Sequence, residues 1–392
     1  MRLTFCYMHV SPYHHVRLTA LSRLSNVTVV EYGDTDGMAF KGYDGEKAYN
    51  SIRLQQSFKD ASLLEMKLNE TSPDVLLLPG WGYDYAISAL SWALVRNVPV
   101  VVISDSYEQL DGQHLWRELA KSRILRLFSA GLAAGKRSSI YLAKLGMPKE
   151  RIFTGCDVID NRHFADGAEA AQRNVTTCRE KLGLPKNYFL VVNRFVPEKN
   201  LFRLLQAYEG YRRAGAPGDW KLCLVGGGEL REEILRCRAE LGIEAHVLLA
   251  GPKNYEELPA YYSLAGSLVL ASINETWGLV VNEAMAAGLP ILVSHRCGCA
   301  DDLVEKGRNG YTFDPYDVDA LSAHMLKMAG GEYDLSSMAN AGREIIARWS
   351  PEFCAENTLK AAEAALSAPR PRLGLLDKLL LKAARAKLSR NL

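Results

Sequence analysis

The chain has 392 residues, 48% of them hydrophobic and 23% charged, a composition that gives two globular domains enough apolar surface for a core each. The 47 basic and 45 acidic side chains leave a net charge of +2, so no nucleic-acid partner is expected and a polyanion would have to find a local basic patch. The eight cysteines include no CxxC pair, and Cys297-Gly298-Cys299 is spaced too tightly for a usual zinc knuckle, so neither a metal site nor a disulfide framework is indicated.

In the first half of the chain, short apolar runs alternate with amphipathic helical segments, the pattern of a parallel sheet with crossover helices. The runs are fully apolar rather than alternating, as strands covered on both faces should be. The expected strands are residues 2–8, 27–32, 74–78, 99–103 and 126–133.

Polar and aromatic residues follow three of these strands, in loops 9–15, 79–84 and 104–108. In a doubly wound sheet such loops line the ligand crevice at the carboxyl ends of the strands. A polar, irregular stretch at residues 156–177 then interrupts the pattern and is expected to be a linker.

After this stretch the alternation of strands and helices restarts, so two similar α/β sheets in tandem fit better than one large sheet. The expected elements are strand 188–193, helix 200–213, strand 220–225, helix 229–241, strand 246–250, helix 255–264 and strand 267–272. We expect Rossmann-like, doubly wound domains at 1–165 and 166–350, facing a central cleft that holds the active site. We expect C-terminal helices at 351–392 that return to the first domain.

Residues 274–290, NETWGLVVNEAMAAGLP, carry two glutamates in different settings. Glu275 lies in a loop after an expected strand, and Glu283 lies about one turn into a helix over 279–287, which Gly288 ends as a left-handed cap. The glutamates are therefore not a paired acid and base on one helix face.

Between the glutamates, Trp277, Gly278 and Leu279 bring backbone N–H groups to a helix amino terminus, which suits a diphosphate. Gly278 has no side chain to keep a ligand away from those amides. A carboxylate such as Glu283 can accept from both hydroxyls of a ribose, and Glu275 can hold sugar hydroxyls on the other side of the phosphates. The pattern predicts a nucleotide-sugar site.

A second cluster, NRFVPEKN, follows the expected strand 188–193. Its Arg194 and Lys199 should converge on the same crevice, where two cations beside a helix amino terminus would neutralise a leaving diphosphate without a metal. Elsewhere, an Arg and a Lys five residues apart are most often solvated surface residues.

These stretches, with LVGGGEL and DDLVEKGRNGYTFDP, resemble the retaining glycosyltransferases of family 4 over residues 188 to about 350. The resemblance implies a GT-B fold and a metal-independent, retaining hexosyl transfer with no cofactor besides the nucleotide-sugar, UDP-linked first and GDP-linked next. It implies catalytic roles for Arg194, Lys199 and Glu275. Asp105, which stands where relatives have a histidine, is predicted as a further catalytic residue. The implied donor-binding residues are Arg194, Lys199, Gly226, Gly251, Pro252, Glu275, Thr276, Trp277, Gly278, Leu279 and Glu283.

The amino-terminal half departs from this family. SPYHH stands where many relatives have a glycine-rich loop, and ISDSYE stands where relatives commonly have a histidine. Asp105 is one substitute for that histidine, and His14 or His114 are the others. The expected acceptor-binding residues are His14, Trp81, Tyr83, Asp105 and Tyr107, although buried aromatics are more often packing residues.

The carboxyl end places leucines at helical spacing among lysines and arginines, from Pro369 to residue 392. Two interpretations stay open: a final helix packed on the body, and a helix that docks on an anionic membrane surface. No signal peptide and no apolar run of about 18 residues is present, so we expect a cytoplasmic protein, peripheral at the inner membrane face, in surface-polysaccharide or glycolipid assembly.

Two alternatives to a transferase also remain. A nucleotide-sugar epimerase would share the donor site but would need no acceptor. A catalytically idle subunit that binds nucleotide-sugar or partner proteins is favoured by the missing glycine loop and histidine, and disfavoured by the complete set of Arg194, Lys199, Glu275 and Glu283.

Overall fold

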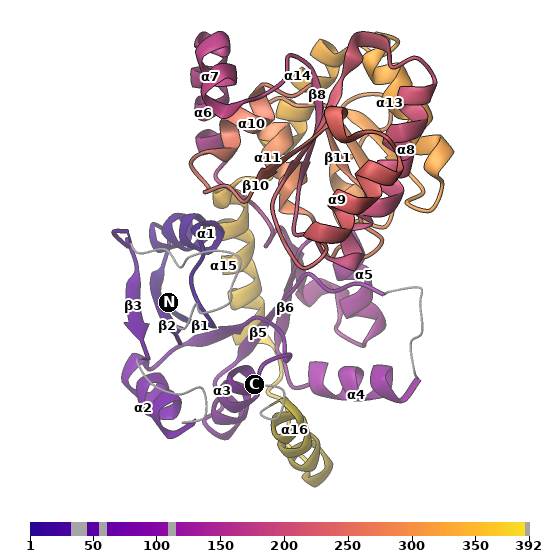
Figure 1. Ribbon diagram of the computed structural model, residues 1–392. Coiled ribbons are helices and arrows are strands. Elements are labelled where there is room, and N and C mark those ends of the chain that lie inside the picture. The colour runs from indigo at the N-terminus through magenta and orange to yellow at the C-terminus, as the bar shows by residue number, and fades with distance from the viewer. Residues whose placement is uncertain (33–44, 55–60, 109–114, 389–392) are drawn as a thin grey trace. The chain divides into compact units, whose positions relative to one another are not determined.

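The computed structural model describes most of the chain, and these residues form two compact units (Figure 1). Unit 1 comprises residues 1–158 and 351–392, and unit 2 comprises residues 159–350. The described ranges are 1–32, 45–54, 61–108 and 115–388.

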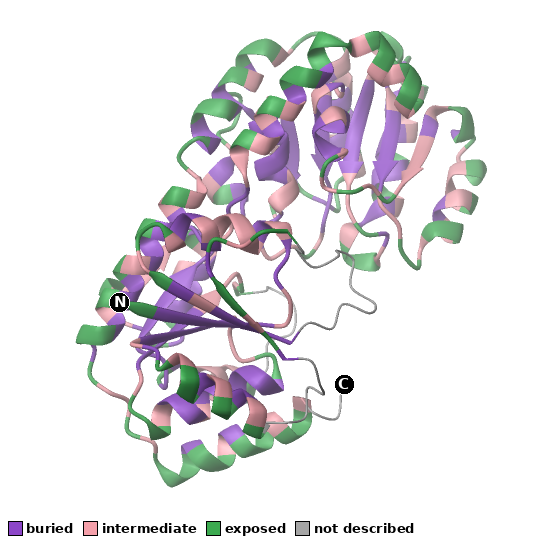
Figure 2. Cartoon of the chain, turned by 90° about the vertical axis from the view of Figure 1, so that its left-hand side faces the viewer, coloured by how far each residue is buried: buried purple, intermediate pink, exposed green. Residues whose placement is uncertain are grey.

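Unit 1 contains a parallel sheet of seven strands in the order β3-β2-β1-β4-β5-β6-β7. The strands at the centre of the sheet are largely buried, because helices cover both faces of the sheet (Figure 2). The strands are β1 (Arg2–Tyr7), β2 (Asn26–Glu31), β3 (Asn50–Arg53), β4 (Val75–Leu78), β5 (Val100–Ser104), β6 (Ala130–Ala133) and β7 (Ile152–Thr154). The strand expected at 126–133 begins only at Ala130, because Leu127 and Phe128 pack into the core from the turn before it.

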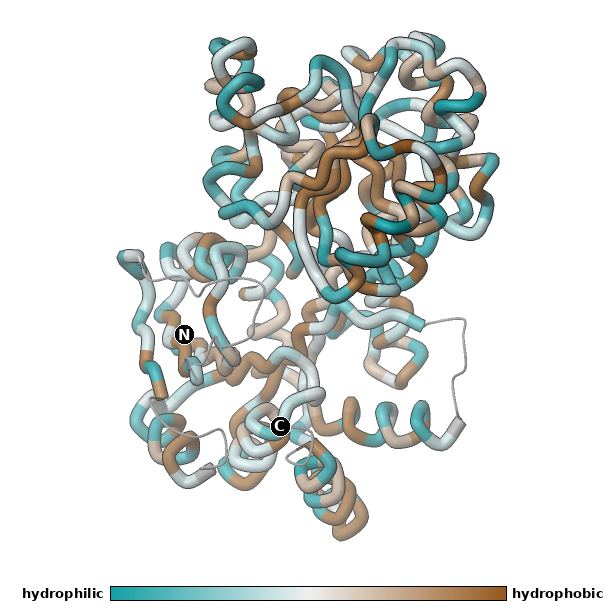
Figure 3. Tube along the Cα trace, in the orientation of Figure 1, coloured by the Kyte–Doolittle hydropathy of each residue, from teal (hydrophilic) through white to brown (hydrophobic). Residues whose placement is uncertain are grey.

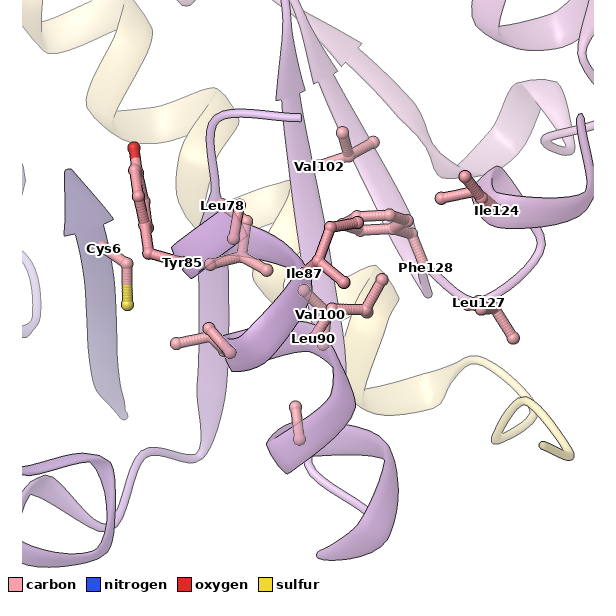
Figure 4. Packing of buried hydrophobic residues seen from close by; sticks show 14 of the residues in the cluster. Cys6, Leu78, Tyr85, Ile87, Leu90, Val100, Val102, Ile124, Leu127 and Phe128 are labelled. Atoms are coloured by element: carbon pink, nitrogen blue, oxygen red, sulfur yellow. The ribbon is translucent and has the colours of Figure 1, made fainter. Parts of the chain in front are cut away.

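The helices of unit 1 come from both ends of the chain. They are α1 (Pro12–Ser22), α2 (Ala61–Thr71), α3 (Asp84–Val95), α4 (Leu115–Leu125), α5 (Lys136–Lys144), α15 (Pro351–Ser367) and α16 (Leu375–Leu388), with a 3₁₀ turn at Lys149–Arg151. One core cluster joins α3 to the sheet, with Tyr85, Ile87 and Leu90 packed near Val102 and Phe128 (Figure 4).

The chain returns to unit 1 through α15, which packs on α1, β6 and β7. The side chain of Asn357 donates to the carbonyl of Thr154 at 3.0 Å. Gly155, with φ +98, admits the ring of Phe353, since a Cβ there would lie 2.4 Å from a ring carbon. These contacts attach the C-terminal segment to the end of β7, and α16 then packs on α3 and α4.

Unit 2 contains a parallel sheet of six strands in the order β10-β9-β8-β11-β12-β13. Runs rich in Val, Leu and Ile form most of these strands, and Figure 3 shows the sheet as the most hydrophobic part of the unit. The strands are β8 (Tyr188–Val192), β9 (Lys221–Val225), β10 (Val247–Gly251), β11 (Ser267–Leu270), β12 (Ile291–Ser294) and β13 (Gly310–Phe313).

The helices of unit 2 cover this sheet, with α8 packed on α9 and α13, and α11 packed on α6, α10 and α14. They are α6 (Asn161–Arg173), α7 (Val175–Leu182), α8 (Leu201–Arg213), α9 (Arg231–Glu240), α10 (Leu258–Ser263), α11 (Leu279–Ala286), α12 (Ala300–Leu303), α13 (Val318–Ala329) and α14 (Leu335–Ile346), with 3₁₀ turns at Pro197–Lys199, Pro217–Asp219 and Glu244–His246.

The linker expected at 156–177 is largely helical. Asp160 caps α6 by accepting from the backbone N–H of His163 at 3.1 Å, and Phe164, Ala168 and Ala171 are buried at helical spacing. The packing of α6 on α10 and α11 assigns it to unit 2, so the units divide at 158/159 rather than at 165/166.

A buried carboxylate at the end of β2 joins three segments of unit 1. Glu31, 2% exposed, accepts from the backbone N–H of Val10 at 3.2 Å, from Lys47 at 2.6 Å and from Ser51 at 3.0 Å. Burial alone would raise the pKa of Glu31, but the hydrogen bond and charge of Lys47, with Ser51 and Arg53, lower it below its ordinary value of 4.5.

Glu31→Gln should therefore lower the free energy of unfolding by about 3 kcal/mol at neutral pH, because it leaves Lys47 without its partner. Because the folded pKa is lowered, the contribution of the carboxylate is full above pH 4.5 and is lost as the pH falls through the folded pKa. Urea unfolding of both proteins over a pH series measures this difference.

Glu70→Gln is the matched control, since Glu70 pairs with Lys67 on the surface and is 51% exposed. Its effect should stay within about 0.5 kcal/mol. The pKa argument would be wrong if Glu31→Gln lowered the free energy of unfolding as much well below pH 4.5 as at neutral pH.

Candidate active site

Three loops meet at the carboxyl edge of the unit 2 sheet, because β8, β11 and β12 are neighbours and parallel. The loops are residues 193–199, 271–278 and 295–299, called the edge loops below. Backbone hydrogen bonds tie the first two together, since the N–H of Ile273 donates to the carbonyl of Glu198 at 2.9 Å. The edge loops bring together most of the donor-binding residues that the sequence predicts.

Lys199 and Glu275 form an ion pair between two edge loops. Their side chains are 14% and 16% exposed, so the pair lies at the rim of the site. The hydroxyl of Ser272 donates to the same carboxylate at 3.2 Å. Arg194, in the loop after β8, is exposed, and no ion pair to it occurs among the residues the structure describes.

The amino terminus of α11 follows directly from the second edge loop. Gly278 takes φ +105 there, a conformation that favours glycine, and Trp277 is 3% exposed. The indole N–H of Trp277 donates to the side chain of Asn282 at 3.0 Å, within the first turns of α11. The loop is thus held to its own helix by a buried hydrogen bond.

The third edge loop supports the second from behind. The N–H of Gly298 donates to the carbonyl of Glu275 at 2.9 Å, and that of Cys299 donates to the carbonyl of Trp277 at 3.1 Å. A Cβ at Gly298 would lie 1.8 Å from the carbonyl oxygen of Thr276, so only glycine permits this approach. Cys297 and Cys299 are fully buried here and help to form the support for the loop.

Glu283 lies deeper than Glu275, in the second turn of α11, and is 1% exposed. The hydroxyl of Tyr262, on α10, donates to its carboxylate at 2.5 Å. Tyr255 is also near, since burial and then the charge of Glu283 raise the pKa of Tyr255. A buried carboxylate needs such donors, because an ionised group without hydrogen bonds is costly to bury.

A glycine directly after β9, Gly226, lets the loop after β8 approach closely. A Cβ at Gly226, which takes φ +137, would lie 1.8 Å from the carbonyl oxygen of Asn193. The N–H of Gly226 donates to the carbonyl of Gly251 at 3.0 Å, and Pro252 follows at the edge of the sheet. The close approach alone requires a glycine at position 226. The presence of glycine there is therefore not by itself evidence of phosphate binding.

The side chain of Asn193 lies at the end of β8 beside this glycine. Both its amide nitrogen and its amide oxygen are buried, and neither has a hydrogen-bond partner among the described residues. An amide buried in this way costs about 1 to 3 kcal/mol unless another group satisfies it. The edge of the sheet therefore holds an unsatisfied donor and acceptor next to Arg194.

Four residues that support the site were not singled out from the sequence. Asn200 sits between the Lys199 turn and α8, and Arg296 donates from its Nε to the carbonyl of Ile273 at 2.8 Å. The other two are Tyr262 and Asn282. Of the four, only Asn282 could have been found from the sequence. A buried indole N–H needs an acceptor, and Asn282 is a polar residue five positions after Trp277.

The predicted acceptor residues belong to unit 1. Trp81 follows β4, packs on the core of the unit and lies with its ring centroid 6.0 Å from that of Phe128. Tyr83 is 43% exposed and stacks on Tyr85 at 5.3 Å. Tyr107 follows β5, the neighbour of β4, and lies under the guanidinium of Arg137. Of the predicted aromatics, Tyr83 thus presents the largest exposed surface, and Trp81 is partly a packing residue.

His14 is part of the amino-terminal cap of α1. Its Nδ1 accepts from the backbone N–H of Ser11 at 3.2 Å, and its own N–H donates to the Ser11 hydroxyl at 3.4 Å. Burial, with the charges of Arg17 and His9, lowers the pKa of His14 to about 3, so the ring is neutral. His114 lies outside the described residues.

Asp105 follows β5 and is partly exposed at the carboxyl edge of the unit 1 sheet. It lies near Asp157, which pairs with Arg17 at 3.2 Å. Burial, opposed by Arg17 and reinforced by Asp105, raises the pKa of Asp157 to about 6. The two carboxylates thus lie close enough to interact electrostatically. Asp157 is next to Val158, where the chain leaves unit 1.

Two properties of the described residues bear on metal binding and on membrane spanning. No three His, Cys, Asp or Glu side chains lie close enough together to hold a metal ion. Among the same residues, none of the helices has both the length and the apolar character that a membrane span requires.

Residues 175–345 match the family model of the glycosyl transferases group 1. The GDP-mannose-dependent alpha-(1-6)-phosphatidylinositol monomannoside mannosyltransferase of Mycolicibacterium smegmatis is 32% identical over 193 residues, which cover 47% of this chain and 49% of that one. The O-antigen chain mannosyltransferase B of Escherichia coli is 29% identical over 177 residues, or 45% of each chain. The chain spans about half the length of these curated relatives.

Solved structures resemble most of the chain. A glycosyltransferase from Rickettsia africae matches with a TM-score of 0.73 at 14% identity, over 93% of this chain and 98% of that one. HepE of Anabaena in complex with UDP matches with a TM-score of 0.71 at 15% identity, over 93% and 100%. These matches confirm the predicted fold, two Rossmann-like domains of the GT-B type. The family match shows that residues 175–345 are similar to the glycosyl transferases group 1.

The Tyr262–Glu283 hydrogen bond leads to a test of the site's architecture. Tyr262→Phe should lower the free energy of unfolding by about 1.5 to 3 kcal/mol, because the buried carboxylate loses a donor. Tyr261→Phe is the matched control, since it removes the hydroxyl of an adjacent tyrosine that is 1% exposed and leaves Glu283 untouched. Urea unfolding measures both, and equal effects of the two substitutions would show that Tyr262 does not stabilise Glu283.

Proposed function

We propose that this protein is a retaining, metal-independent glycosyltransferase that moves a sugar from a nucleotide-diphosphate donor to a hydroxyl of a saccharide or glycolipid. The observation that carries the proposal is the ion pair of Lys199 and Glu275 at the rim of the edge loops, beside the amino terminus of α11. A cation, a carboxylate and free helix amides are the groups that a sugar diphosphate needs from a protein.

The donor diphosphate would bind between Arg194, Lys199 and the backbone amides at Trp277 to Leu279. Its arrival would replace Glu275 as the partner of Lys199 and free the carboxylate to accept from sugar hydroxyls. Asn193, whose buried amide has no partner among the described residues, would gain one from the ligand. Glu283 would hold the ribose, supported by Tyr262.

Transfer would break the bond between sugar and phosphate through an oxocarbenium-like state. Positive charge grows on the sugar and negative charge grows on the diphosphate, where Arg194, Lys199 and the helix amides would stabilise it. The acceptor hydroxyl would attack on the face that the donor leaves, and its proton would pass to the departing phosphate oxygen. Glu275 would position the sugar, and no covalent nucleophile is required.

The proposed donor nucleoside is either uridine or guanosine. The sequence resemblance favours UDP, whereas the name of the M. smegmatis relative specifies GDP-mannose and that of the E. coli relative specifies a mannosyltransferase. Both relatives are named for glycolipid or surface-polysaccharide products, which supports an acceptor of that kind. On the acceptor side, Tyr83, Tyr107 and Asp105 of unit 1 are the proposed contacts.

Binding of the donor is tested by thermal unfolding with UDP-, GDP-, ADP-, CDP- and dTDP-sugars in the absence of metal. A donor at about a hundred times its dissociation constant should stabilise the protein by roughly 2.7 kcal/mol, and we expect this for one base. Lys199→Ala and Arg194→Ala should each reduce the shift. Arg213→Ala, which removes a cation 76% exposed on the surface of the same unit, should not.

The outcomes separate the alternatives. A shift followed by sugar transfer to an acceptor supports the proposal. Release of nucleotide with an altered sugar in the absence of any acceptor would indicate an epimerase. A shift without either reaction, or no shift with any base, would favour the idle subunit.

The stereochemistry and metal dependence form a separate prediction. The product linkage, read by NMR, should keep the anomeric configuration of the donor, and a chelator should leave the rate unchanged. Lys199→Ala should lower the rate about 100-fold, because the charge on the departing diphosphate is less stabilised. An inverted linkage or a chelator-sensitive rate would refute this part of the proposal.

A further inference from the structure

Two helices of unit 1 carry an unusual share of the exposed apolar side chains. On α16, Leu375 is 77% exposed, and Leu376 and Leu379 are each 56% exposed. On α4, Trp116 is 61% exposed and Leu119 is 71% exposed. Scattered exposed leucines need no explanation, but five large apolar side chains on two packed helices do.

The helix α16 has two apolar faces with different surroundings. Its inner face packs on the core of unit 1, where Leu381 is 4% exposed and Leu380, Ala384 and Leu388 join the same cluster. Leu375 and Leu379 lie on the opposite face, with exposed Lys378 and Lys382 beside them. The helix is therefore anchored to the unit, and its second apolar face remains at the surface.

An ion pair joins α16 to α4. Arg123, in the last turn of α4, donates from its Nε to Asp377 at 2.7 Å, and Asp377 also accepts from the backbone N–H of Gly374 at 2.9 Å. Trp116, Leu119 and Arg123 share one face of α4, because their spacing is three and four residues. The ion pair thus holds the last turn of α4 against the first turn of α16, and both helices carry exposed apolar side chains.

The charge of this region is strongly positive. Residues 369–392 contain seven basic residues and one acidic residue, Asp377, in a chain whose net charge is only +2. The basic residues are Arg370, Arg372, Lys378, Lys382, Arg385, Lys387 and Arg390. Apolar side chains with a tryptophan, flanked by lysines, match the interface of an anionic bilayer, where leucines enter the acyl region and lysines meet the headgroups.

We propose that Trp116 and Leu119 of α4 and Leu375, Leu376 and Leu379 of α16 form a composite docking surface for an anionic lipid bilayer. The surface lies on helices that take no part in donor binding, so it functions independently of the edge loops. Deletion of residues 369–392 would be a poor test, because it also removes Leu381 from the core.

The test is sedimentation of the full chain with vesicles of phosphatidylcholine, alone or mixed with phosphatidylglycerol. The protein should partition onto the anionic vesicles only, and less so at high salt. Leu375→Ser with Leu379→Ser, and separately Trp116→Ser with Leu119→Ser, should each weaken partitioning about tenfold or more, because each pair removes apolar area that the bilayer would bury. Lys378→Glu with Lys382→Glu should also weaken it, with every leucine in place.

Leu24→Ser and Ile140→Ser are the matched controls, since these residues are 53% and 60% exposed on other parts of unit 1. They should leave partitioning unchanged. All variants should keep the thermal shift with the donor, which separates failure of docking from failure of the proposed function. An intact partition coefficient in the α4 variant would refute the composite surface. A dimer that the variants abolish, without vesicle binding, would assign the surface to a second copy of the chain.

Discussion

The arrangement of the edge loops depends on one buried side chain, that of Asn200. It is 5% exposed, and its amide donates to the carbonyls of Ala271 at 3.1 Å and Pro315 at 2.8 Å. The residue takes φ +56, which asparagine tolerates better than most residues. Because it follows Lys199 directly and binds the ends of β11 and β13, it places the cation of one loop against the carboxylate of the next. The ion pair that would receive the donor is therefore set by a neutral amide beneath it.

The local part of this arrangement could be predicted from the sequence. Gly278 and Gly288 delimit α11 as expected, and the loop with Glu275 follows β11. The supporting contacts could not be predicted, because they join residues far apart in the chain. Tyr262 reaches Glu283 from another helix, and Gly298 approaches Thr276 from the loop after the next strand. Propensity and spacing report on neighbours within an element, whereas these pairs form only when the sheet has ordered its strands.

Unit 1 illustrates the opposite limit, since the structure gives one of its predicted residues, His14, a local role in a helix cap. The SPYHH segment forms a helix cap, in which Ser11 and His14 satisfy each other's backbone groups. The usual capping box has a Glu or Gln at the position of His14. Without that residue, the sequence does not show whether the histidine belongs to a loop or to a helix cap. The helix at 161–173 was likewise difficult to predict from the sequence. Its polar residues outnumber the three buried side chains of its inner face, so the stretch resembles a linker.

The two interpretations of the carboxyl end, a packed helix and a docking helix, prove to be compatible. One face of α16 packs on the core of unit 1. The opposite face also carries leucines, and these are exposed. A docking helix that is anchored in this way loses little conformational freedom when it meets a bilayer, so more of its apolar contact is retained as binding free energy. The same unit carries the loops after β4 and β5, and the chain continues from the β5 loop toward α4. If unit 1 docks on a bilayer as proposed, its loops after β4 and β5 would meet an acceptor that resides in the same bilayer.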